Sequence, residues 1–418
     1  MIDITLLRQN PDLVEKTAKS RGATVSVHEL LKIDAEIRTL QSDTDTMRHG
    51  LKSRSKSKPS EEERQELQAL STRIKEKEGE ITTKEAARTE MLLALPNFND
   101  PETPIGASED ENVVIKTIGT KPEFSFEPKP YYELPSVAPD LKIESGTRTS
   151  GSRFYYLTGN IAALQRAVFR AVGDIISAEG FNFVIPPLLV REPAMYGTGH
   201  FPAERNEVYT VNPGEDDLYL VGTAEVPLVS LHAGETLQME NMPYAYAAET
   251  TCFRREAGSY GKDQQGILRV HQFQKIEMVA FTTPEQSREM HRRILALEEK
   301  IISAFDLHYQ VVNICTGDLG FPATQKFDIE AWFPSQNKFR ELTSTSNTTD
   351  YQTRRLQITY KNGNDRHLAH TVNGTGATDR LWLAILEQNQ QADGSVKLPQ
   401  LLHKYLPWHT LYAPTPRS

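Results

Sequence analysis

The chain has 418 residues, of which 38% are hydrophobic and 25% are charged, so it is long enough for two or three domains with a large core. Its formal net charge of −9 argues against a generic nucleic-acid binder, although a local basic patch remains compatible with it. The two cysteines, Cys252 and Cys315, are too few for a disulfide framework or a four-cysteine zinc site.

The N-terminus indicates a cytoplasmic protein. The stretch MIDITLLRQNPDLVEK contains acids where a signal peptide has basic and then apolar residues. No apolar run approaches the roughly 20 residues that span a bilayer, so we expect no membrane partner.

Two runs of residues spaced by four and three predict a pair of long helices between about residues 28 and 95. The first run is Ile33, Ile37, Leu40, Thr44, Met47 and Leu51, and the second is Leu67, Leu70, Ile74, Lys77, Ile81, Lys84, Arg88, Met91 and Leu95. Ser60 followed by three glutamates is a typical helix start. We expect an antiparallel coiled-coil arm about 45 Å long, with a middle that the seam lysines weaken.

The turn between these helices is basic. Five cations without an intervening acid occupy this part of the sequence: Arg48, Lys52, Arg54, Lys56 and Lys58. Such a tip suits a phosphate backbone and slightly favours RNA as the partner. A solvated or protein-docking coiled coil is the alternative for any charged hairpin.

Prolines and asparagines mark a boundary after the arm. We divide the chain into an N-terminal domain at 1–100, a linker at 101–112 and a larger domain at 113–418. In the larger domain, Ile161–Glu179 is expected to be a helix stopped by Gly180, and a strand at Phe181–Val190 is interrupted by Pro186 and Pro187. Thr223 and Glu225 either contact a small polar ligand or cap the helix that follows them.

A hairpin is predicted over Thr251–Ala280. Its second strand has polar and aromatic residues at alternate positions, which places them on one face of a sheet: Arg269, His271, Phe273, Lys275 and Glu277. Arginine suits phosphate, an aromatic ring suits a base, and a carboxylate suits an ammonium group. A nucleotide beside an amino acid would satisfy this face, whereas a solvated edge hairpin is the simpler alternative.

Two further segments contribute candidates. Gln325–Trp332 and Lys338–Thr343 are expected to pair as strands that carry Glu330 and Glu341. A glycine loop at 373–379 then leads Arg380 into a helix, where its side chain is placed for phosphate or lies on the helix surface.

These segments together resemble the three signature motifs of class II aminoacyl-tRNA synthetases. Their residue sequences in detail resemble those of seryl-tRNA synthetases. The matching stretches are YGTGHFP, TAEVPL, CFRREAGS, RVHQFQKIEM, FRELTSTSN, DYQTRR and HTVNGTG, and the basic arm is also a hallmark of that family. The resemblance covers essentially the whole chain. It implies an α+β fold with an antiparallel catalytic sheet flanked by helices, and a homodimer with the Pro187 segment at its interface.

The resemblance also implies how ATP and Mg²⁺ are bound. Arg254, Arg380 and Glu341 would be catalytic, with Arg254 on both the α-phosphate and the serine carboxylate. Phe273 would stack on adenine. The remaining ATP contacts would come from Arg255, Glu256, Arg269, Val270, Leu342, Thr343 and Ser344. Glu341 and Ser344 would carry the metal.

L-serine would be enclosed by Thr223, Ala224, Glu225, Arg254, Glu277 and Thr375, which must hydrogen-bond its hydroxyl to reject alanine. The implied reaction activates serine with ATP and transfers it to tRNA(Ser). Whether tRNA(Sec) is also charged stays open.

The loop at 259–265 departs from the family, since Tyr260, Lys262 and Gln265 stand where alanine and two arginines are usual. Two rival functions are an RNA-binding relative without catalysis and an enzyme that charges a carrier protein. Intact motif residues argue against the first, and the basic arm argues against the second.

Overall fold

The computed structural model describes residues 1–54, 60–257 and 265–413. The chain divides into two compact units, Met1–Phe98 and Asn99–Ser418. None of the described helices is long and apolar enough to cross a membrane.

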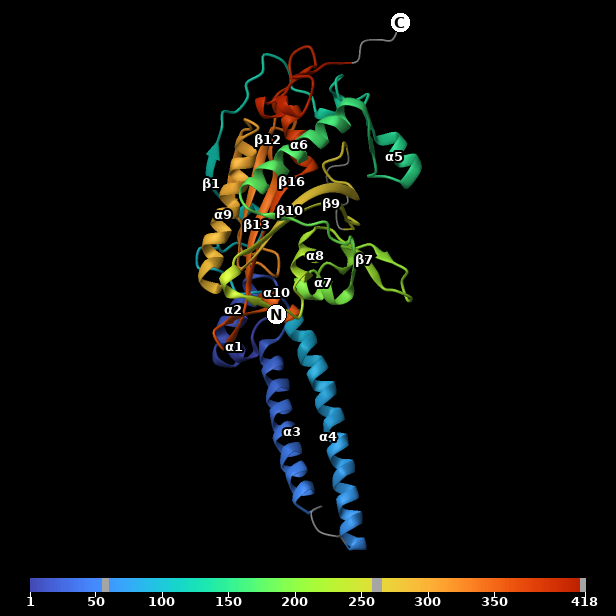
Figure 1. The fold of residues 1–418 in the computed structure, drawn as a ribbon, viewed down its shortest axis with the longest axis vertical. Coiled ribbons are helices and arrows are strands. Elements are labelled where there is room, and N and C mark those ends of the chain that lie inside the picture. The colour runs from blue at the N-terminus through green and yellow to red at the C-terminus, as the bar shows by residue number, and fades with distance from the viewer. Residues whose placement is uncertain (55–59, 258–264, 414–418) are drawn as a thin grey trace. The chain divides into compact units, whose positions relative to one another are not determined.

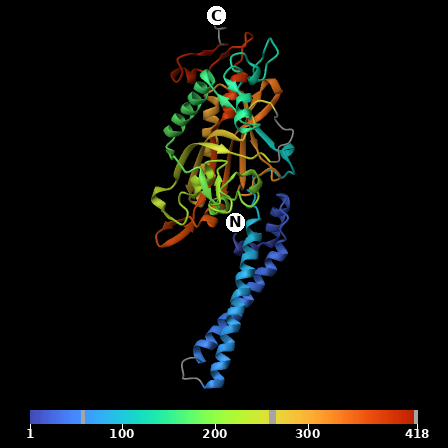
Figure 2. The ribbon, with the colours of Figure 1, turned by 90° about the vertical axis from the view of Figure 1, so that its right-hand side faces the viewer.

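The described part of the first unit consists of four helices: α1 (Ile4–Gln9), α2 (Pro11–Ser20), α3 (Val27–Arg54) and α4 (Glu61–Leu93). The long helices α3 and α4 run side by side in opposite directions (Figures 1 and 2). Ser60 caps α4 in a reciprocal pattern, because its hydroxyl accepts from the Glu63 amide at 3.2 Å and its own amide donates to the Glu63 carboxylate at 2.8 Å. The predicted start of the second helix is therefore confirmed.

The seam between α3 and α4 is only partly apolar. Ile37 and Ile74 are buried, but basic seam residues of α4 reach across to acids of α3. Lys77 pairs with Asp43 at 3.0 Å, and Lys84 pairs with Glu36 at 2.8 Å. These cross-pairs hold the region that we expected the lysines to weaken.

At the base of the arm, apolar side chains of all four helices form a small core. The buried Asp34 lies in this region and accepts from Arg8 at 2.7 Å and from Arg88 at 2.9 Å, with Arg38 at 3.3 Å. A carboxylate at this position breaks the apolar pattern of the seam, and three guanidinium groups compensate for its burial.

The second unit is built on a large sheet (Figure 1). Eight described strands form it in the order β1 (Val113–Ile118), β11 (Tyr309–Asn313), β12 (Gln325–Phe333), β13 (Lys338–Thr349), β16 (His370–Thr378), β10 (Gln272–Thr282), β9 (Tyr244–Phe253) and β4 (Asn182–Phe183). Neighbouring strands are antiparallel except for β4 and β9, which are parallel. The expected α+β architecture is confirmed.

Smaller elements surround the sheet. The helices are α5 (Ile143–Ser150), α6 (Gly159–Ala178), α7 (Glu192–Thr198), α8 (Glu225–Ser230), α9 (Pro284–Ser303), α10 (Tyr351–Leu356) and α11 (Asp379–Gln388). The short strands are β2 (Leu141–Lys142), β3 (Tyr156–Leu157), β5 (Leu189–Arg191), β6 (Thr210–Val211), β7 (Leu218–Leu220), β8 (Thr236–Gln238), β14 (Thr359–Asn362), β15 (Asp365–Leu368), β17 (Val396–Lys397) and β18 (Thr410–Leu411).

Helices α6 and α9 pack closely on one face of the central strand β16. A Cβ atom added at Gly374 would lie 2.3 Å from Ile294 of α9, and one added at Gly376 would lie 2.5 Å from Ile176 of α6. Because side chains alternate along a strand, Thr375 between these glycines and Asn373 before them face the other side of the sheet. That other side is where the functional cavity lies.

Two expectations about local structure were wrong. The run at 373–378 is part of β16 and not a glycine loop. Arg269 and His271 precede β10, which begins at Gln272, so they do not share a strand face with Phe273. The expected interruption at Pro186 and Pro187 is confirmed: this segment separates β4 from β5, because a proline has no amide proton to donate to a sheet ladder.

Candidate active site

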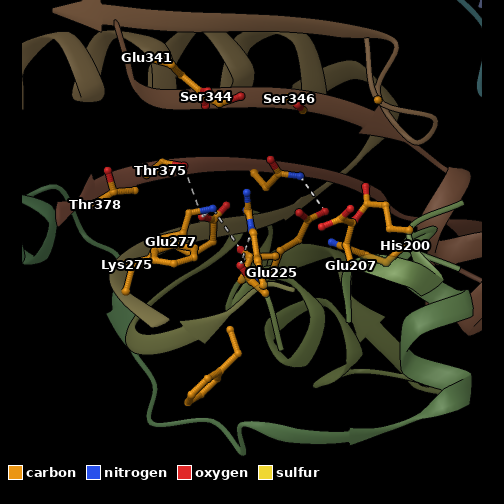
Figure 3. A pocket seen from close by; sticks show the side chains of 18 of the residues that line it. His200, Glu207, Glu225, Lys275, Glu277, Glu341, Ser344, Ser346, Thr375 and Thr378 are labelled. Carbon is orange, nitrogen blue, oxygen red and sulfur yellow. Dashed lines mark hydrogen bonds and ion pairs between the residues drawn. The ribbon is translucent and has the colours of Figure 1, made fainter. Parts of the chain in front are cut away.

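A cavity of about 600 Å³ opens on the sheet face opposite α6 and α9. Asn373 and Thr375 of β16 line it, and so do Phe273, Lys275 and Glu277 of β10. The period-two spacing that we predicted for these β10 residues is confirmed, since alternate residues of a strand share a face. Figure 3 shows Glu341, Ser344 and Ser346 along β13, with Thr375 and Thr378 on the adjacent β16.

Two carboxylates meet at one end of the cavity, Glu225 at the start of α8 and Glu277 on β10 (Figure 3). Glu277 is buried and forms an ion pair with the buried Lys275. Lys275 also donates to the Thr223 hydroxyl at 3.1 Å, while Thr375 contacts Glu277 at 3.5 Å. This end of the cavity is therefore acidic, enclosed and lined with hydroxyl groups.

The pKa of Glu277 is raised to about 7: burial is the main cause and the charge of Glu225 adds to it, whereas Lys275 and Arg254 act in the opposite direction. A lysine at this position thus keeps a deeply buried carboxylate close to ionisation at neutral pH. Behind the sheet, Glu298 of α9 accepts from the Thr375 amide at 2.9 Å. Burial raises the pKa of Glu298 well above its ordinary value, and the neighbouring Glu277 adds to this rise.

The other end of the cavity is lined by three arginines that come from separate segments of the chain: Arg254 after β9, Arg269 before β10 and Arg380 in the first turn of α11. The Arg254 guanidinium lies 5.3 Å from the centre of the Phe273 ring. Arg269 pairs with Glu256. Arg380 donates to the Glu341 carbonyl at 2.9 Å. Three planar cations around one cavity match a polyphosphate.

Glu341 lies beside these cations, with its carboxylate 3.4 Å from Arg380. Desolvation acts to raise the pKa of Glu341, but Arg380, Lys326 and Arg254 together lower it below its ordinary value. Glu341 is therefore an ionised carboxylate at neutral pH. Ser344 lies three residues further along β13 and lines the same cavity.

Most of the residues predicted for the site come together in this cavity. Those that line it are Thr223, Glu225, Arg254, Glu256, Arg269, Val270, Phe273, Glu277, Glu341, Leu342, Ser344, Thr375 and Arg380. Three others do not line it: Ala224 and Thr343 are buried, and Arg255 is exposed. The Thr343 hydroxyl donates to Glu298 at 2.9 Å, behind the sheet.

The basic residues of the arm lie in the other unit. Arg48 pairs with Glu78 at 2.7 Å and Arg54 pairs with Glu66 at 2.6 Å, so acids of α4 accompany the cations of α3. Lys56 and Lys58 lie outside the described residues.

The unusual loop is also incompletely described. Tyr260 and Lys262 lie outside the described residues. Gln265 accepts a hydrogen bond from Tyr132 at 2.8 Å.

Sequence reasoning missed several cavity residues, including Asn373, Lys326, Ser346 and His200. Asn373 was detectable, because it lies two positions before Thr375 and shares its strand face, but the run was interpreted as a loop. Lys326 and Ser346 follow from the pairing of β12 with β13, in which Lys326 is opposite Ser346. We find no local signal for His200, which the turn after α7 brings to the cavity.

Two family models match the chain. One describes a seryl-tRNA synthetase N-terminal domain and covers residues 1–99. The other describes a tRNA synthetase class II core domain (G, H, P, S and T) and covers residues 209–389.

Similar proteins extend over the full length. A serine--tRNA ligase of Nocardia farcinica is 44% identical over 99% of this chain and 100% of its own, and one of Thermobifida fusca is 42% identical over 97% of each. A crystal structure of seryl-tRNA synthetase from Pyrococcus horikoshii with ATP is 36% identical, with a TM-score of 0.94 over 99% of this chain and 100% of that one. A serine-tRNA ligase of Naegleria fowleri with AMP has a TM-score of 0.88 at 30% identity over 99% of each chain.

Proposed function

Because this chain belongs to the seryl-tRNA synthetase family, we propose that it activates L-serine with ATP and transfers the seryl group to the 3′ end of tRNA(Ser). The observation that carries the proposal is the polarity of the single cavity. Arg254, Arg269 and Arg380 line one end, and Glu225 and Glu277 line the other. A nucleoside triphosphate and an amino acid fit this division of charge.

In the activation step, a serine carboxylate oxygen forms a bond to the α-phosphorus of ATP while the bond to pyrophosphate breaks. The seryl group then passes from AMP to a ribose hydroxyl of the tRNA. Neither step needs a nucleophile from the protein. The contribution of this chain is to hold the two reactants together and to stabilise the negative charge that develops at phosphorus. Arg254 is suited to both tasks, because it lines the arginine end and its charge still reaches Glu277, whose pKa it lowers.

We also propose Mg²⁺ as a cofactor, held by Glu341 and Ser344. Both groups offer oxygen, the donor that Mg²⁺ prefers, and Glu341 is ionised. No cluster of three or more metal-binding side chains occurs among the described residues, so oxygens of the ATP phosphates would complete the ligand set. When bound, the metal would neutralise phosphate charge.

For assembly, we propose a homodimer through the segment around Pro187. Three large apolar side chains are exposed there: Phe183 at 43%, Ile185 at 100% and Leu189 at 40%. Exposed apolar side chains that cluster in this way are typical of an interaction surface. Sedimentation analysis of the purified protein tests this, and an Ile185→Asp variant should shift a dimer toward the monomer. We further propose a cytoplasmic location, where tRNA substrates are charged.

Serine-dependent exchange of labelled pyrophosphate into ATP tests the activation step. In the presence of Mg²⁺, we expect exchange with L-serine to exceed exchange with L-alanine or L-threonine at least about 100-fold. Alanine lacks the hydroxyl of serine, so its binding leaves polar groups of the pocket without a hydrogen-bond partner. Charging of tRNA(Ser) transcripts tests the second step. Folded protein that shows no serine-dependent exchange would contradict the proposal.

A further inference from the structure

Gln352 lies at the centre of a buried hydrogen-bond network next to the cavity. It belongs to α10, its side chain is fully buried, and it does not line the cavity itself. Its amide nitrogen donates to Glu225 Oε1 at 2.7 Å and to the Thr198 carbonyl at 3.0 Å. Its amide oxygen accepts from the Thr371 hydroxyl at 2.7 Å, while the Thr348 hydroxyl, 3.3 Å from that oxygen, lies closer to the Thr371 carbonyl at 2.8 Å.

The partners fix the orientation of this amide. If the amide were turned over, its oxygen would face the Thr198 carbonyl and the Glu225 carboxylate, which both lack a proton to donate. The two threonine hydroxyls would then have to accept from the amide nitrogen, and the carboxylate would lose its donor. The observed orientation satisfies these partners, so one N–H group points at Glu225 and the other at the Thr198 carbonyl.

Gln352 thereby determines which oxygen of Glu225 is available. Asn373 donates to the same atom, Oε1, at 2.9 Å, so two neutral amides occupy that oxygen. No donor among the described residues occupies Oε2, and Glu225 lines the cavity. The carboxylate is thus held by one oxygen and presents the other.

Glu225 and Glu277, the two carboxylates at this end of the cavity, differ in the groups that compensate their charge. Glu277 is paired with the buried ammonium group of Lys275. Glu225 receives hydrogen bonds only from uncharged amides. One carboxylate that is not neutralised remains at this end, and it matches the single positive charge of an amino-acid ammonium group.

We propose that Gln352 is a positioning residue for the amino-acid substrate: it holds Glu225 so that Oε2 accepts from the substrate's α-ammonium group. This inference rests on the proposed serine activation and adds to it a residue outside the cavity. Gln352 does not touch the substrate, and its effect is exerted through Glu225.

A Gln352→Met variant tests the role, because methionine has a similar length and makes none of these hydrogen bonds. In pyrophosphate exchange we expect the KM for serine to rise about 10- to 100-fold, the loss that corresponds to a misplaced hydrogen bond to a charged group. The KM for ATP should stay within about twofold, because the arginine end is not connected to this network. A Thr371→Val variant removes the hydroxyl that donates to the Gln352 oxygen, and we expect the KM for serine to rise about threefold.

Gln388 provides the matched control. It is also a buried glutamine, and it donates to the carbonyls of His308 at 3.0 Å and Trp332 at 2.9 Å and accepts from the His308 amide at 2.8 Å. It does not line the cavity. A Gln388→Met variant should lower the melting temperature without changing the KM for serine.

The outcomes separate the two proposals. An unsubstituted protein without serine-dependent exchange overturns the proposed function and this inference with it. An active unsubstituted protein whose Gln352→Met variant keeps its KM for serine, or loses serine and ATP affinity equally, overturns the inference alone. If Gln352→Met does not fold, Thr371→Val decides, and an unchanged KM for serine then counts against the role of Gln352.

Discussion

Glu277 is the residue that we expect to determine how the activity depends on pH. The carboxylate is fully surrounded by protein, and burial alone would favour its protonated form. The groups that face it are Lys275 on the same strand, Glu225 from α8, Arg254 after β9 and Glu298 from α9. Lys275 and Arg254 favour the ionised form, while the other carboxyls oppose it.

We therefore expect kcat/KM for serine to fall as the pH is lowered through about 7, the pKa of Glu277, because the ionised form pairs with Lys275 and accepts from the substrate. Pyrophosphate exchange from pH 5.5 to 9 measures this. A Lys275→Met variant should move the acid limb to higher pH, since the cation that lowers the pKa is gone. An acid limb at the same pH in both proteins would mean that Glu277 does not set it.

The stability effect of Glu277 follows from the same shift. The folded pKa is raised above the unfolded value, so its contribution to stability is fully present below the unfolded pKa and is lost as the pH rises through about 7. Activity and stability thus respond to pH in opposite directions at this residue.

Arg254 and Arg255 are neighbours in sequence with different placements, and they form a matched pair of variants. Arg254 lines the cavity, whereas Arg255 does not. We expect Arg254→Ala to reduce serine-dependent exchange at least about 100-fold, the usual cost of removing a charge-stabilising group. Arg255→Ala should retain activity within about threefold. Equal losses of exchange activity in the two variants would contradict the prediction that Arg254, and not Arg255, stabilises the reaction.

At the scale of elements, α3 depends on one buried acid. Hydrogen bonding to Arg8 is the main cause that lowers the pKa of Asp34, and Arg88 adds to it. Asp34 therefore contributes stability that is present above the unfolded pKa and is lost as the pH falls through the folded pKa. Its side chain is fully buried, so loss of its charge leaves guanidinium groups without a partner at the base of the arm.

We predict that Asp34→Asn lowers the opening free energy of the α3 and α4 backbone amides near the base by about 3 kcal/mol, toward the lower end for a broken buried ion pair because Arg8 and Arg38 reach water. Hydrogen exchange followed by mass spectrometry on the full chain measures it. Asp43→Asn is the control. That side chain is 51% exposed in its pair with Lys77, so its loss should cost no more than about 0.5 kcal/mol.

Elements with a strong local signal could be predicted from the sequence. The capping residues before α4 and the spacing along α3 and α4 depend on neighbours within a few positions, and so does the apolar stripe of α6. The burial of Asp34 could not be predicted, because it depends on Arg8 and Arg88, which are 26 and 54 residues away. The glycines of β16 were misinterpreted for a similar reason: they permit the close packing of α6 and α9, which no local pattern reveals.

The candidate site divides along the same line. Glu277 and Phe273 follow from the period of two along β10, and the family motifs supply the arginines and Glu341. The residues that surround these side chains had no local signal in the sequence. Gln352, Glu298 and His200 reach the site through α10, α9 and the turn after α7, and only the packing of these elements on the sheet brings them there.

On the scale of the whole molecule, the chemistry and the arm belong to different units. All described residues that line the cavity fall within Asn99–Ser418, and none falls within Met1–Phe98. The arm carries basic residues at the end of α3 that the proposed activation of serine does not use. Binding of tRNA is the proposed task that needs such a phosphate-binding surface.

This division predicts that the two activities can be separated by substitution. Replacement of Lys52, Arg54, Lys56 and Lys58 by alanine should raise the KM for tRNA(Ser) at least about 10-fold and make its dependence on salt less steep, because each lost phosphate contact removes a released counterion. Serine-dependent exchange should stay within about twofold.

The exposed pair of Arg54 with Glu66 does not prevent phosphate binding, since such pairs contribute little free energy in water. Alanine at Lys361 and Arg366, exposed cations of the β14–β15 hairpin, controls for a general loss of positive charge. If the arm substitutions reduced exchange and tRNA charging by the same factor, the arm would be acting on the fold of the enzyme, and its role in binding tRNA would have to be abandoned.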